Sequence, residues 1–336
     1  MISLETNRAL RDENTLHLPA RALRFLRADQ LDQAREAIEL AREQRWPLLV
    51  LGGGSNLVLT RDFPGLCLQI ALAGISHRPL DGEWVEVSAA AGESWHGFVE
   101  HCLMQGWYGL ENLALIPGTV GASPIQNIGA YGVEIKDFFH ELEAIDRTTG
   151  KLRRFTRAQC GFGYRDSVFK RDGRDRYVIT QVTFRLRRKP RLNLAYGALA
   201  QALSHLESPG PRDLFNAVVA LRRAKLPDPA QLPNVGSFFK NPVVSEGQFS
   251  QLKTQYPELV AFPDPKGVKL AAGWLIEKAG WKGVCDGGVA VHEAQALVLV
   301  NRGGARGEDV LRLAGRIQAD IQARFGVGLE IEPRVY

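Results

Sequence analysis

The chain of 336 residues is too long for one small core, so two or three domains are expected. Apolar residues make up 45% and charged residues 24%, a balance that is typical of a soluble globular protein. The net charge is only +5 and the basic residues are dispersed, which argues against nucleic acid as a partner and is compatible with an anionic substrate.

Cysteine and histidine are sparse and scattered. The four cysteines show no C-x-x-C spacing: Cys67, Cys102, Cys160 and Cys285. This pattern argues for a reducing compartment and against a zinc site or a disulfide framework. His96 and His101 lie five apart on a predicted helix, a spacing that does not turn both toward one metal. Neither a signal peptide nor an apolar run of membrane-spanning length is visible, so we expect a cytoplasmic protein with no metal and no membrane partner.

Hydrophobic spacing predicts the first elements of the chain. Apolar residues recur at helical spacing from Asp29 until Pro47, which ends that helix. Short apolar or alternating runs predict strands at residues 48–51, 57–59, 66–70 and 84–88. Ser94 is expected to cap a further helix that ends at Gly106.

Residues 52–56, Gly-Gly-Gly-Ser-Asn, directly follow the first of these strands. Their main-chain N–H groups and the side chains of Ser55 and Asn56 suit an anion such as a pyrophosphate. No Gly-Lys-Ser/Thr follows, and a strand is expected next, so neither a Walker loop nor the G-x-G-x-x-G fingerprint applies. On these grounds alone, a glycine-rich hairpin turn fits equally well.

Residues 116–132 hold four glycines and two prolines and no charged residue. Glycine permits positive φ and lets a ligand lie against the main chain. An uncharged segment with amide donors suits a phosphate or the edge of a flavin ring. The alternative is a long connection between strands, but loops of this length are usually functional, so we favour a ligand cradle.

The second half of the chain alternates further strands and helices. Strands are expected at residues 141–145, 177–186 and 329–332, and residues 293–300 are expected to lead into a further strand. Helices are expected at 214–225, 267–280 and 308–325. The clearest strand, 177–186, places five residues on one face: Val178, Thr180, Val182, Phe184 and Leu186. A stretch rich in proline, residues 190–211, is expected to be a domain boundary.

Three polar groups stand apart from this apolar pattern. Two glycines in residues 161–169 predict a tight turn that aims Arg165, although a surface arginine that caps the turn is an equally good interpretation. Ser237 interrupts a short apolar strand and is either a turn donor or a ligand-facing group. Glu330 and Glu332 share one strand face, where they are solvated or one of them donates a proton.

Six segments in order make nearly the whole chain resemble the UDP-N-acetylenolpyruvoylglucosamine reductase family of flavoenzymes. They are residues 52–56, 116–118 with 126–132, 162–167 (Phe-Gly-Tyr-Arg-Asp-Ser), 225–229 (Lys-Leu-Pro-Asp-Pro), 236–242 (Gly-Ser-Phe-Phe-Lys-Asn-Pro) and 329–332 (Leu-x-x-Glu). Each segment is modest alone, but six in the family's order argue strongly against chance agreement.

The resemblance implies an α+β fold. An FAD-binding unit of the vanillyl-alcohol-oxidase (PCMH) type would occupy residues 1–66 and 67–204 as two subdomains. A C-terminal α+β domain, residues 205–336, would bind substrate and return its final strand to the flavin site. The boundary predicted above agrees with this division. The segment with Tyr196 resembles the one that marks the longer form of the family, in which a tyrosine lies over bound substrate.

The reaction implied is NADPH-dependent reduction of UDP-N-acetylglucosamine enolpyruvate to UDP-N-acetylmuramate, a committed step of peptidoglycan precursor synthesis. FAD would carry the hydride from NADPH to the vinyl carbon C3. We expect the FAD to be non-covalent, since residues 52–56 contain no His or Cys for attachment. A monomer is expected.

Three residues match the family's catalytic positions. Arg165 would hold the substrate carboxylate, and Ser237 would donate the proton to C2. Glu332, if held protonated by a raised pKa, would stabilise the developing charge. The family pattern favours Glu332 over Glu330, but Pro333 stands where valine is usual, which leaves the choice open by one register step.

The remaining matches are binding positions. On the flavin side they are Gly52, Gly53, Gly54, Ser55, Asn56, Ile116, Gly118, Ser123, Gln126, Asn127, Gly129, Tyr131 and Gly132. On the side of the substrate or nicotinamide nucleotide they are Tyr164, Tyr196, Lys225, Asn241, Lys282 and Gln295.

Two rival functions stay open. A flavin oxidase of the same superfamily would share the FAD unit but not the Gly-Ser-Phe-Phe-Lys-Asn segment, and it would consume oxygen without the enolpyruvyl substrate. A noncatalytic nucleotide-sugar-binding protein on this scaffold would be colourless when purified.

Overall fold

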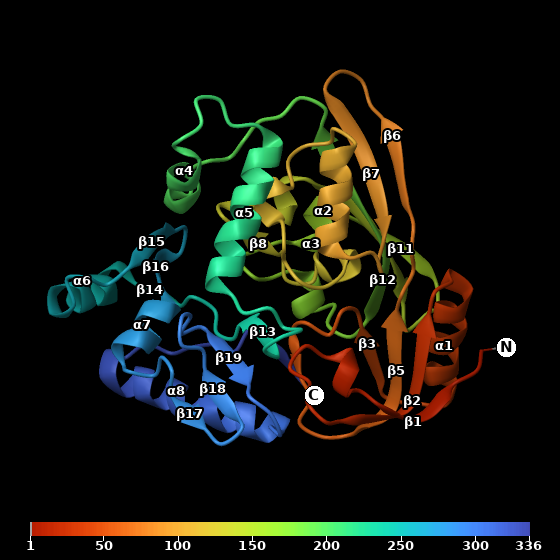
Figure 1. Cartoon of the computed structure of the whole chain (residues 1–336). Helices are drawn as coiled ribbons and strands as arrows, with labels where there is room; N and C mark the ends of the chain where they lie inside the picture. Colours follow the sequence, from red (N-terminus) through yellow and green to blue (C-terminus); the bar gives the residue numbers. More distant parts are fainter. Residues whose placement is uncertain (1) are drawn as a thin grey trace. The chain divides into compact units, whose positions relative to one another are not determined.

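The computed structural model describes residues 2–336, which form two compact units that are each assembled from separate stretches of sequence (Figure 1). Unit 1 comprises residues 2–8, Ala22–Gly53 and Phe63–Arg222. Unit 2 comprises Ala9–Arg21, Gly54–Asp62 and Arg223–Tyr336. The three-part division expected from the sequence stays a prediction beside these two units.

The first sheet of unit 1 has a parallel core. Its order is β1 (Glu5–Ala9), β2 (Arg21–Ala28), β5 (Phe63–Ile70) and β3 (Leu48–Leu51), and β5 runs parallel to both β2 and β3. Helix α1 (Leu31–Glu43) begins at a capping box on Gln30 and buries Ile38 in one cluster with Leu66 of β5. The helix and the strands predicted for this stretch are confirmed.

The second sheet of unit 1 is antiparallel and carries helix α2 on its apolar face. Its order is β11 (Leu152–Thr156), β10 (Phe139–Asp146), β12 (Tyr177–Arg187), β7 (Trp84–Ala90) and β6 (Ile75–Pro79). The predicted cap Ser94 accepts from Gly97 at the start of α2 (Trp95–Met104). Trp95 is fully buried, and its ring lies 5.8 Å from that of Phe184 on β12.

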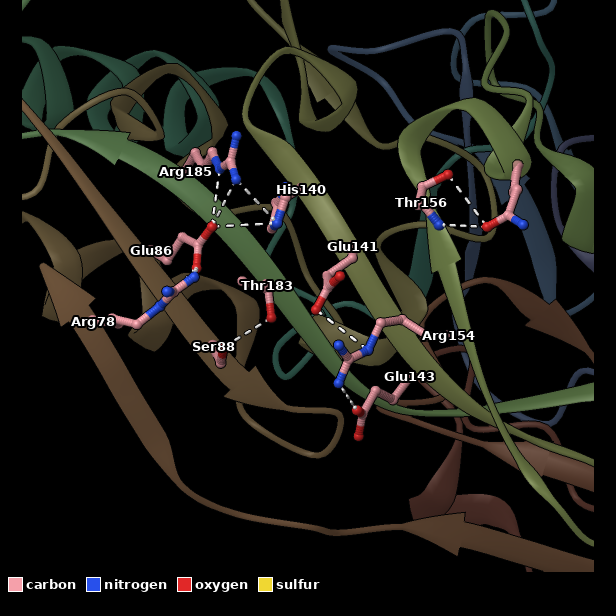
Figure 2. A network of polar contacts seen from close by, with 11 residues as sticks. Arg78, Glu86, Ser88, His140, Glu141, Glu143, Arg154, Thr156, Thr183 and Arg185 are labelled. Carbon is pink, nitrogen blue, oxygen red and sulfur yellow. Dashed lines mark hydrogen bonds and ion pairs between the residues drawn. The ribbon is translucent and has the colours of Figure 1, made fainter. Parts of the chain in front are cut away.

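The opposite face of this sheet is polar (Figure 2). Glu86 on β7 is 6% exposed and accepts hydrogen bonds from Arg78 on β6 and Arg185 on β12. Burial raises the pKa of Glu86, but these hydrogen bonds and the nearby His140 outweigh it, so the net pKa is lowered. Ser88 and Thr183 form a hydrogen bond of 2.7 Å beside them.

The prediction that five alternate residues of β12 share one face is wrong for Val178. Pairing with β10 advances from Glu143↔Gln181 to Ala144↔Ile179, so Thr180 is an extra residue on β12. Such a bulge turns the residues beyond it to the other face. Val178 therefore packs in the cluster of α1, while Val182, Phe184 and Leu186 pack around Trp95.

The other elements of unit 1 are short and lie between the strands or after the second sheet. They are β8 (Gly129–Ala130), β9 (Val133–Glu134), α3 (Arg157–Cys160), α4 (Gly197–Leu203) and most of α5 (Pro211–Lys225), with 3-10 turns η2 (Glu111–Leu113), η3 (Val120–Ala122), η4 (Ile135–Asp137) and η5 (Val168–Lys170). Helix α4 lies inside residues 190–211, the stretch predicted as a boundary.

Unit 2 contains two small sheets and the long helix α8. One sheet has the order β13 (Asn234–Ser237), β19 (Val298–Asn301), β18 (Val289–Val291) and β17 (Cys285–Asp286), and the other β14 (Val243–Val244), β16 (Gly267–Leu270) and β15 (Ala261–Asp264). Its helices are η1 (Arg11–Glu13), α6 (Glu246–Gln255), α7 (Ala272–Lys278) and α8 (Gly307–Phe325). Helix α8 buries Val310, Leu313, Ile317 and Ile321, as predicted.

Residues from early in the chain complete the core of unit 2. Leu16 and Leu18 are fully buried in the same cluster as Phe238 and Ile317. Strand β4 (Leu57–Val58) pairs in parallel with the final strand β20 (Arg334–Val335). Within the described part of the chain, no helix is both long and apolar enough to cross a bilayer.

Two predictions for unit 2 need correction. Residues 267–280 are a strand followed by a helix, because Gly267 has a φ of +141° and lies so close to Val244 that an added Cβ would be 2.2 Å from its carbonyl oxygen. Residues 329–332 form only a bridge, Ile331↔Phe239, and the regular strand comes after Pro333, which has no N–H to donate.

Candidate active site

The glycine-rich segment 116–132 in unit 1 ends in a tight hairpin. Strands β8 and β9 pair through Gly129↔Glu134 and Ala130↔Val133, which leaves Tyr131 and Gly132 as the two turn residues. Both have positive φ, +49° and +79°, as a two-residue turn of this hand requires. A tyrosine seldom adopts this conformation, and backbone strain of this kind concentrates at functional sites.

The turn that carries Arg165 is docked on this segment by side-chain hydrogen bonds. Gly163 and Asp166 pair across the tight turn, and Arg165 has a φ of +50°, so the predicted turn is confirmed. Asn127 donates to the Gly163 carbonyl at 2.9 Å, and Arg165 Nη2 donates to the Gly129 carbonyl at 2.8 Å. The guanidinium of Arg165 is thereby held beside the hairpin of Tyr131.

A second guanidinium, Arg222 of α5, belongs to the same part of unit 1. Its Nε donates to the carbonyl of Leu115 at 3.2 Å. Burial lowers the pKa of Arg222, the phenol of Tyr131 opposes this, and the neighbouring charge of Arg165 lowers it further. The two guanidinium groups repel one another, so their region favours the binding of an anion such as a carboxylate.

Two tyrosines meet at the same place. The rings of Tyr131 and Tyr196 contact edge to face with centroids 5.1 Å apart, and Tyr196 is 38% exposed. Burial raises the pKa of Tyr131, Arg222 lowers it, and Tyr196 raises it further; the net pKa is raised. The phenol of Tyr131 therefore suits an uncharged packing or hydrogen-bonding role at neutral pH.

Sequence reasoning missed two residues of this region. Arg222 lies near the end of the helix predicted at residues 214–225, and only its contact with Leu115, 107 residues away, reveals it. His96 was considered above only as a metal ligand, and its Nδ1 accepts from the N–H of Leu115 at 3.0 Å. Leu115 has a φ of +57° and directly precedes Ile116, so both side chains hold the entry to the glycine-rich segment.

In unit 2, backbone pairing brings the segment that follows Ser237 and the segment of Glu332 side by side. The N–H of Glu332 donates to the carbonyl of Phe238, the residue after Ser237, at 2.9 Å. The N–H of Arg334 donates to the carbonyl of Asn56 at 3.0 Å. The C-terminal segment therefore runs between the Ser237 strand and the end of the Gly-Gly-Gly-Ser-Asn loop.

Glu330 and Glu332 differ in their surroundings. The carboxylate of Glu330 is ion-paired with Lys240, and its side chain is 70% exposed. Glu332 is half-buried, and its N–H is bonded to the carbonyl of Phe238. Because the carboxylate of Glu330 is occupied by Lys240 and solvent, Glu332 is the better candidate for a group that contacts a ligand.

The binding residues predicted in unit 2 have varied surroundings. Asn241 accepts from the N–H of Ala272 at 2.9 Å and so caps α7, while Lys282 pairs with Glu277 at 2.8 Å. Lys225 is exposed and Gln295 is half-buried. The structure gives no direct hydrogen bond between these four predicted residues.

The predicted flavin residues divide between the units and between exposed and buried positions. Gly54, Ser55 and Asn56 belong to unit 2, and the other ten belong to unit 1. Ser123 is 1% exposed, and its hydroxyl donates to the Val120 carbonyl at 2.7 Å. Asn127 is fully buried and uses its amide to hold the Arg165 turn. These two side chains support the cradle from within.

The residue set fits a dinucleotide such as FAD. A Cβ on Gly53 would lie 3.0 Å from the Cα of Gly118, so the two glycine-bearing loops meet main chain to main chain. A Cβ on Gly52 would lie 2.6 Å from Oγ1 of Thr119, whereas one on Gly132 would meet nothing within 4 Å. Bare main chain beside open space offers amide groups to a pyrophosphate or a flavin edge.

Two family models match this chain. The model of the FAD binding domain matches residues 22–156, and the model of the C-terminal domain of UDP-N-acetylenolpyruvoylglucosamine reductase matches residues 228–336. Reductases of that name are similar over the full length. The one from Burkholderia orbicola (strain MC0-3) is 54% identical over 340 residues, which cover 99% of this chain and 97% of the relative. The one from Pseudomonas aeruginosa is 52% identical over 338 residues, with 100% and 99% covered.

Solved structures agree with these matches. The crystal structure of UDP-N-acetylenolpyruvylglucosamine reductase (MurB) from Thermus caldophilus is similar over 100% of both chains, with a TM-score of 0.68 and 25% identity. A solvent-stable cholesterol oxidase is similar over 98% of this chain and 87% of its own, with a TM-score of 0.51 and 14% identity, which concerns the fold alone. The predicted α+β fold, an FAD-binding unit of the vanillyl-alcohol-oxidase type with a C-terminal domain, is confirmed.

Proposed function

Because the chain belongs to the UDP-N-acetylenolpyruvoylglucosamine reductase family, we propose that it reduces UDP-N-acetylglucosamine enolpyruvate to UDP-N-acetylmuramate with NADPH. FAD, bound without a covalent link, supplies the hydride chemistry between NADPH and the vinyl carbon C3. The chain itself must bind the substrate carboxylate, stabilise the charge that develops there, and deliver a proton to C2.

Arg165 binds the carboxylate of the enolpyruvyl group. Its planar guanidinium matches a carboxylate and stays charged at every working pH. The hydrogen bond from Arg165 to Gly129 and the backing of its turn by Asn127 support this role, because they fix the guanidinium before substrate arrives. Arg222 adds a second positive charge to the same region.

Ser237 donates the proton to C2. A serine hydroxyl is a poor acid, but the carbanion-like centre left by hydride addition at C3 is strongly basic, and serine regains its proton from water. Glu332, protonated, donates a hydrogen bond to the substrate carboxylate as charge builds there. The observation that supports this assignment is the bond from the Glu332 N–H to the Phe238 carbonyl, since it pairs the backbone of Glu332 with the residue that follows Ser237.

The remaining predicted residues bind rather than react. The main chain of Gly52, Gly53, Gly54, Gly118, Gly129 and Gly132 contacts FAD, together with Ser55, Asn56, Ile116, Gln126 and Tyr131, while Ser123 and Asn127 support it from below. Tyr164 and Tyr196 pack against the substrate, and Lys225, Asn241, Lys282 and Gln295 contact its diphosphate or the nicotinamide nucleotide. The protein acts in the cytoplasm as a monomer and needs neither nucleic acid nor a membrane.

The experiment that tests this function is an anaerobic stopped-flow measurement on the Ser237→Ala variant. NADPH is expected to bleach the flavin at the parental rate, whereas the enolpyruvyl UDP-sugar restores the colour about 10²–10⁴-fold more slowly than in the parent, the usual cost of losing a proton donor. Unchanged recolouring would remove Ser237 from this role. Rapid recolouring of the parent by oxygen but not by the UDP-sugar would indicate an oxidase instead.

A further inference from the structure

Ser237 lies on the face of the sheet opposite to Val235 because β13 carries one extra residue between them. The pairing with β19 runs from Asn234↔Val300 to Ser237↔Val298, so three steps on β13 oppose two steps on β19. The bulge contains Gly236, whose φ of +71° is the conformation that such bulges require. Without the extra residue, Ser237 would share the face of Val235, which is buried in the apolar core.

The side chain of Asn234 holds this bulge in place. Its Oδ1 accepts from the N–H of Gly236 at 2.8 Å. Its Nδ2 donates to the carbonyl of Leu232 at 2.8 Å and to that of Pro227 at 3.1 Å. Pro227 lies two residues after Lys225, so one amide ties the Lys225 segment to the Ser237 segment.

The main chain of Asn234 is fixed as well. Its N–H donates to the carbonyl of Thr15 at 2.9 Å, and its carbonyl accepts from Oγ1 of Thr15 at 2.6 Å. Asn234 is 2% exposed, so its amide has no bulk water with which to replace these partners. The side chain of Asn234 therefore has one orientation that satisfies all these bonds. That orientation fixes the backbone of Gly236 and, with it, the position of Ser237.

We propose that Asn234 is a positioning residue of the reductase: through the Gly236 bulge it aims the Ser237 hydroxyl at the substrate, and through Pro227 it sets the segment that carries Lys225. This rests on the proposed role of Ser237 as proton donor. Asn234 touches neither substrate nor cofactor, and its effect on the reaction passes through Ser237. A hydroxyl displaced by about 1 Å is enough to slow a proton transfer about 10²-fold.

The test is a double-mutant comparison between Asn234→Asp and Ser237→Ala. The Asp side chain keeps the size of Asn but cannot donate to the two carbonyls. In the parental background, Asn234→Asp should slow flavin recolouring by the enolpyruvyl UDP-sugar about 10²-fold, with NADPH-driven bleaching unchanged. In the Ser237→Ala background it should add less than about twofold, because residues that act as a unit are not additive.

Asn301 provides a matched control in the same unit. It is 5% exposed, its Nδ2 donates to the carbonyl of Leu16 at 2.8 Å, and its Oδ1 accepts from Gly303, also two residues later, at 2.9 Å. Asn301→Asp introduces the same chemical change on the adjacent strand β19, at a side chain that bonds neither Gly236 nor Pro227. It should lower thermal stability while the recolouring step stays within about twofold of the parent.

The outcomes distinguish a failure of the positioning role of Asn234 from a failure of the proton-donor role of Ser237. If Ser237→Ala leaves recolouring unchanged, the proposed role of Ser237 as proton donor fails, and the reductase function itself is tested separately by recolouring of the parent with the UDP-sugar. If Ser237→Ala slows it but Asn234→Asp slows it equally in both backgrounds, or slows bleaching as much, the positioning role is overturned. Should Asn234→Asp not retain flavin, Gly236→Ala takes its place, because an added Cβ meets nothing within 4 Å and only the positive φ is disturbed. The same non-additivity with Ser237→Ala is then expected, and additive effects overturn the proposal.

Discussion

The two C-terminal glutamates offer the sharpest prediction, because substitutions two residues apart should have very different consequences. Glu330 is 70% exposed and pairs with Lys240, and an exposed ion pair contributes about 0–1 kcal/mol. Glu330→Gln should therefore lower the free energy of unfolding by no more than about 1 kcal/mol and leave turnover within about threefold.

Glu332→Gln preserves the shape of the side chain but removes the carboxylic acid that we propose as a hydrogen-bond donor to the substrate. Loss of one preorganised donor to a developing negative charge costs about 10²–10³ in rate, or about 2.7–4 kcal/mol of transition-state stabilisation. We expect the whole loss in the step that the enolpyruvyl UDP-sugar drives, since bleaching by NADPH does not involve this carboxyl group. The two variants should then differ by at least about 30-fold in that step.

The assay measures both half-reactions anaerobically, at one pH, with each variant compared at equal flavin content. Thermal unfolding of the same samples shows whether a slow variant is merely less stable. The reasoning is refuted if Glu330→Gln is the slower variant, or if both variants recolour within about threefold of the parent. The first outcome would move the acid by one register step, as the proline at position 333 had left open.

Two further predictions concern stability. Glu86→Gln should lower the free energy of unfolding by about 1–2 kcal/mol at neutral pH. Because the pKa of Glu86 is lowered in the folded state, this difference is fully present above the ordinary carboxyl pKa of 4.5 and is lost as pH falls through the lower folded-state pKa. Urea titrations across pH test this, and Ser88→Ala should show a pH-independent loss. Gly132→Ala should lower the free energy of unfolding by about 1–2 kcal/mol, because alanine is strained at a φ of +79° although its Cβ would meet no atom within 4 Å. Gly132→Asn should lower it less, because asparagine adopts this conformation more readily. Equal melting temperatures for both variants and the parent would contradict this.

Local chemistry made part of this structure predictable. Ser94 caps its helix, and the glycines around Arg165 form a tight turn, because each depends on residues close in sequence. The bulge at Thr180 was not predictable, since it depends on how β12 pairs with β10. Periodicity alone assumes uninterrupted alternation and so misplaced Val178.

The proposed catalytic residues of the candidate site were predictable from the sequence, but the residues that hold them in position were not. Family-like motifs pointed to Arg165, Ser237 and Glu332, whereas Arg222 and Asn234 carried no local signal. Arg222 is one of several basic residues near the end of its helix, where a cation is common. Asn234 is a polar residue in a short strand, and its bonds to Pro227 and Gly236 become visible only when the loop before the strand is folded back on it.

The pairing of β4 with β20 has a consequence for biosynthesis. Thr60 donates to the carbonyl of Tyr336, 276 residues later, and at ~5–20 residues per second a ribosome needs about 14–55 s to cover that distance. Leu16, Leu18 and Val58 emerge long before the other buried members of their cluster, which begin at Val235. Nascent chains of this protein should therefore present an apolar N-terminal stretch to chaperones for most of their translation.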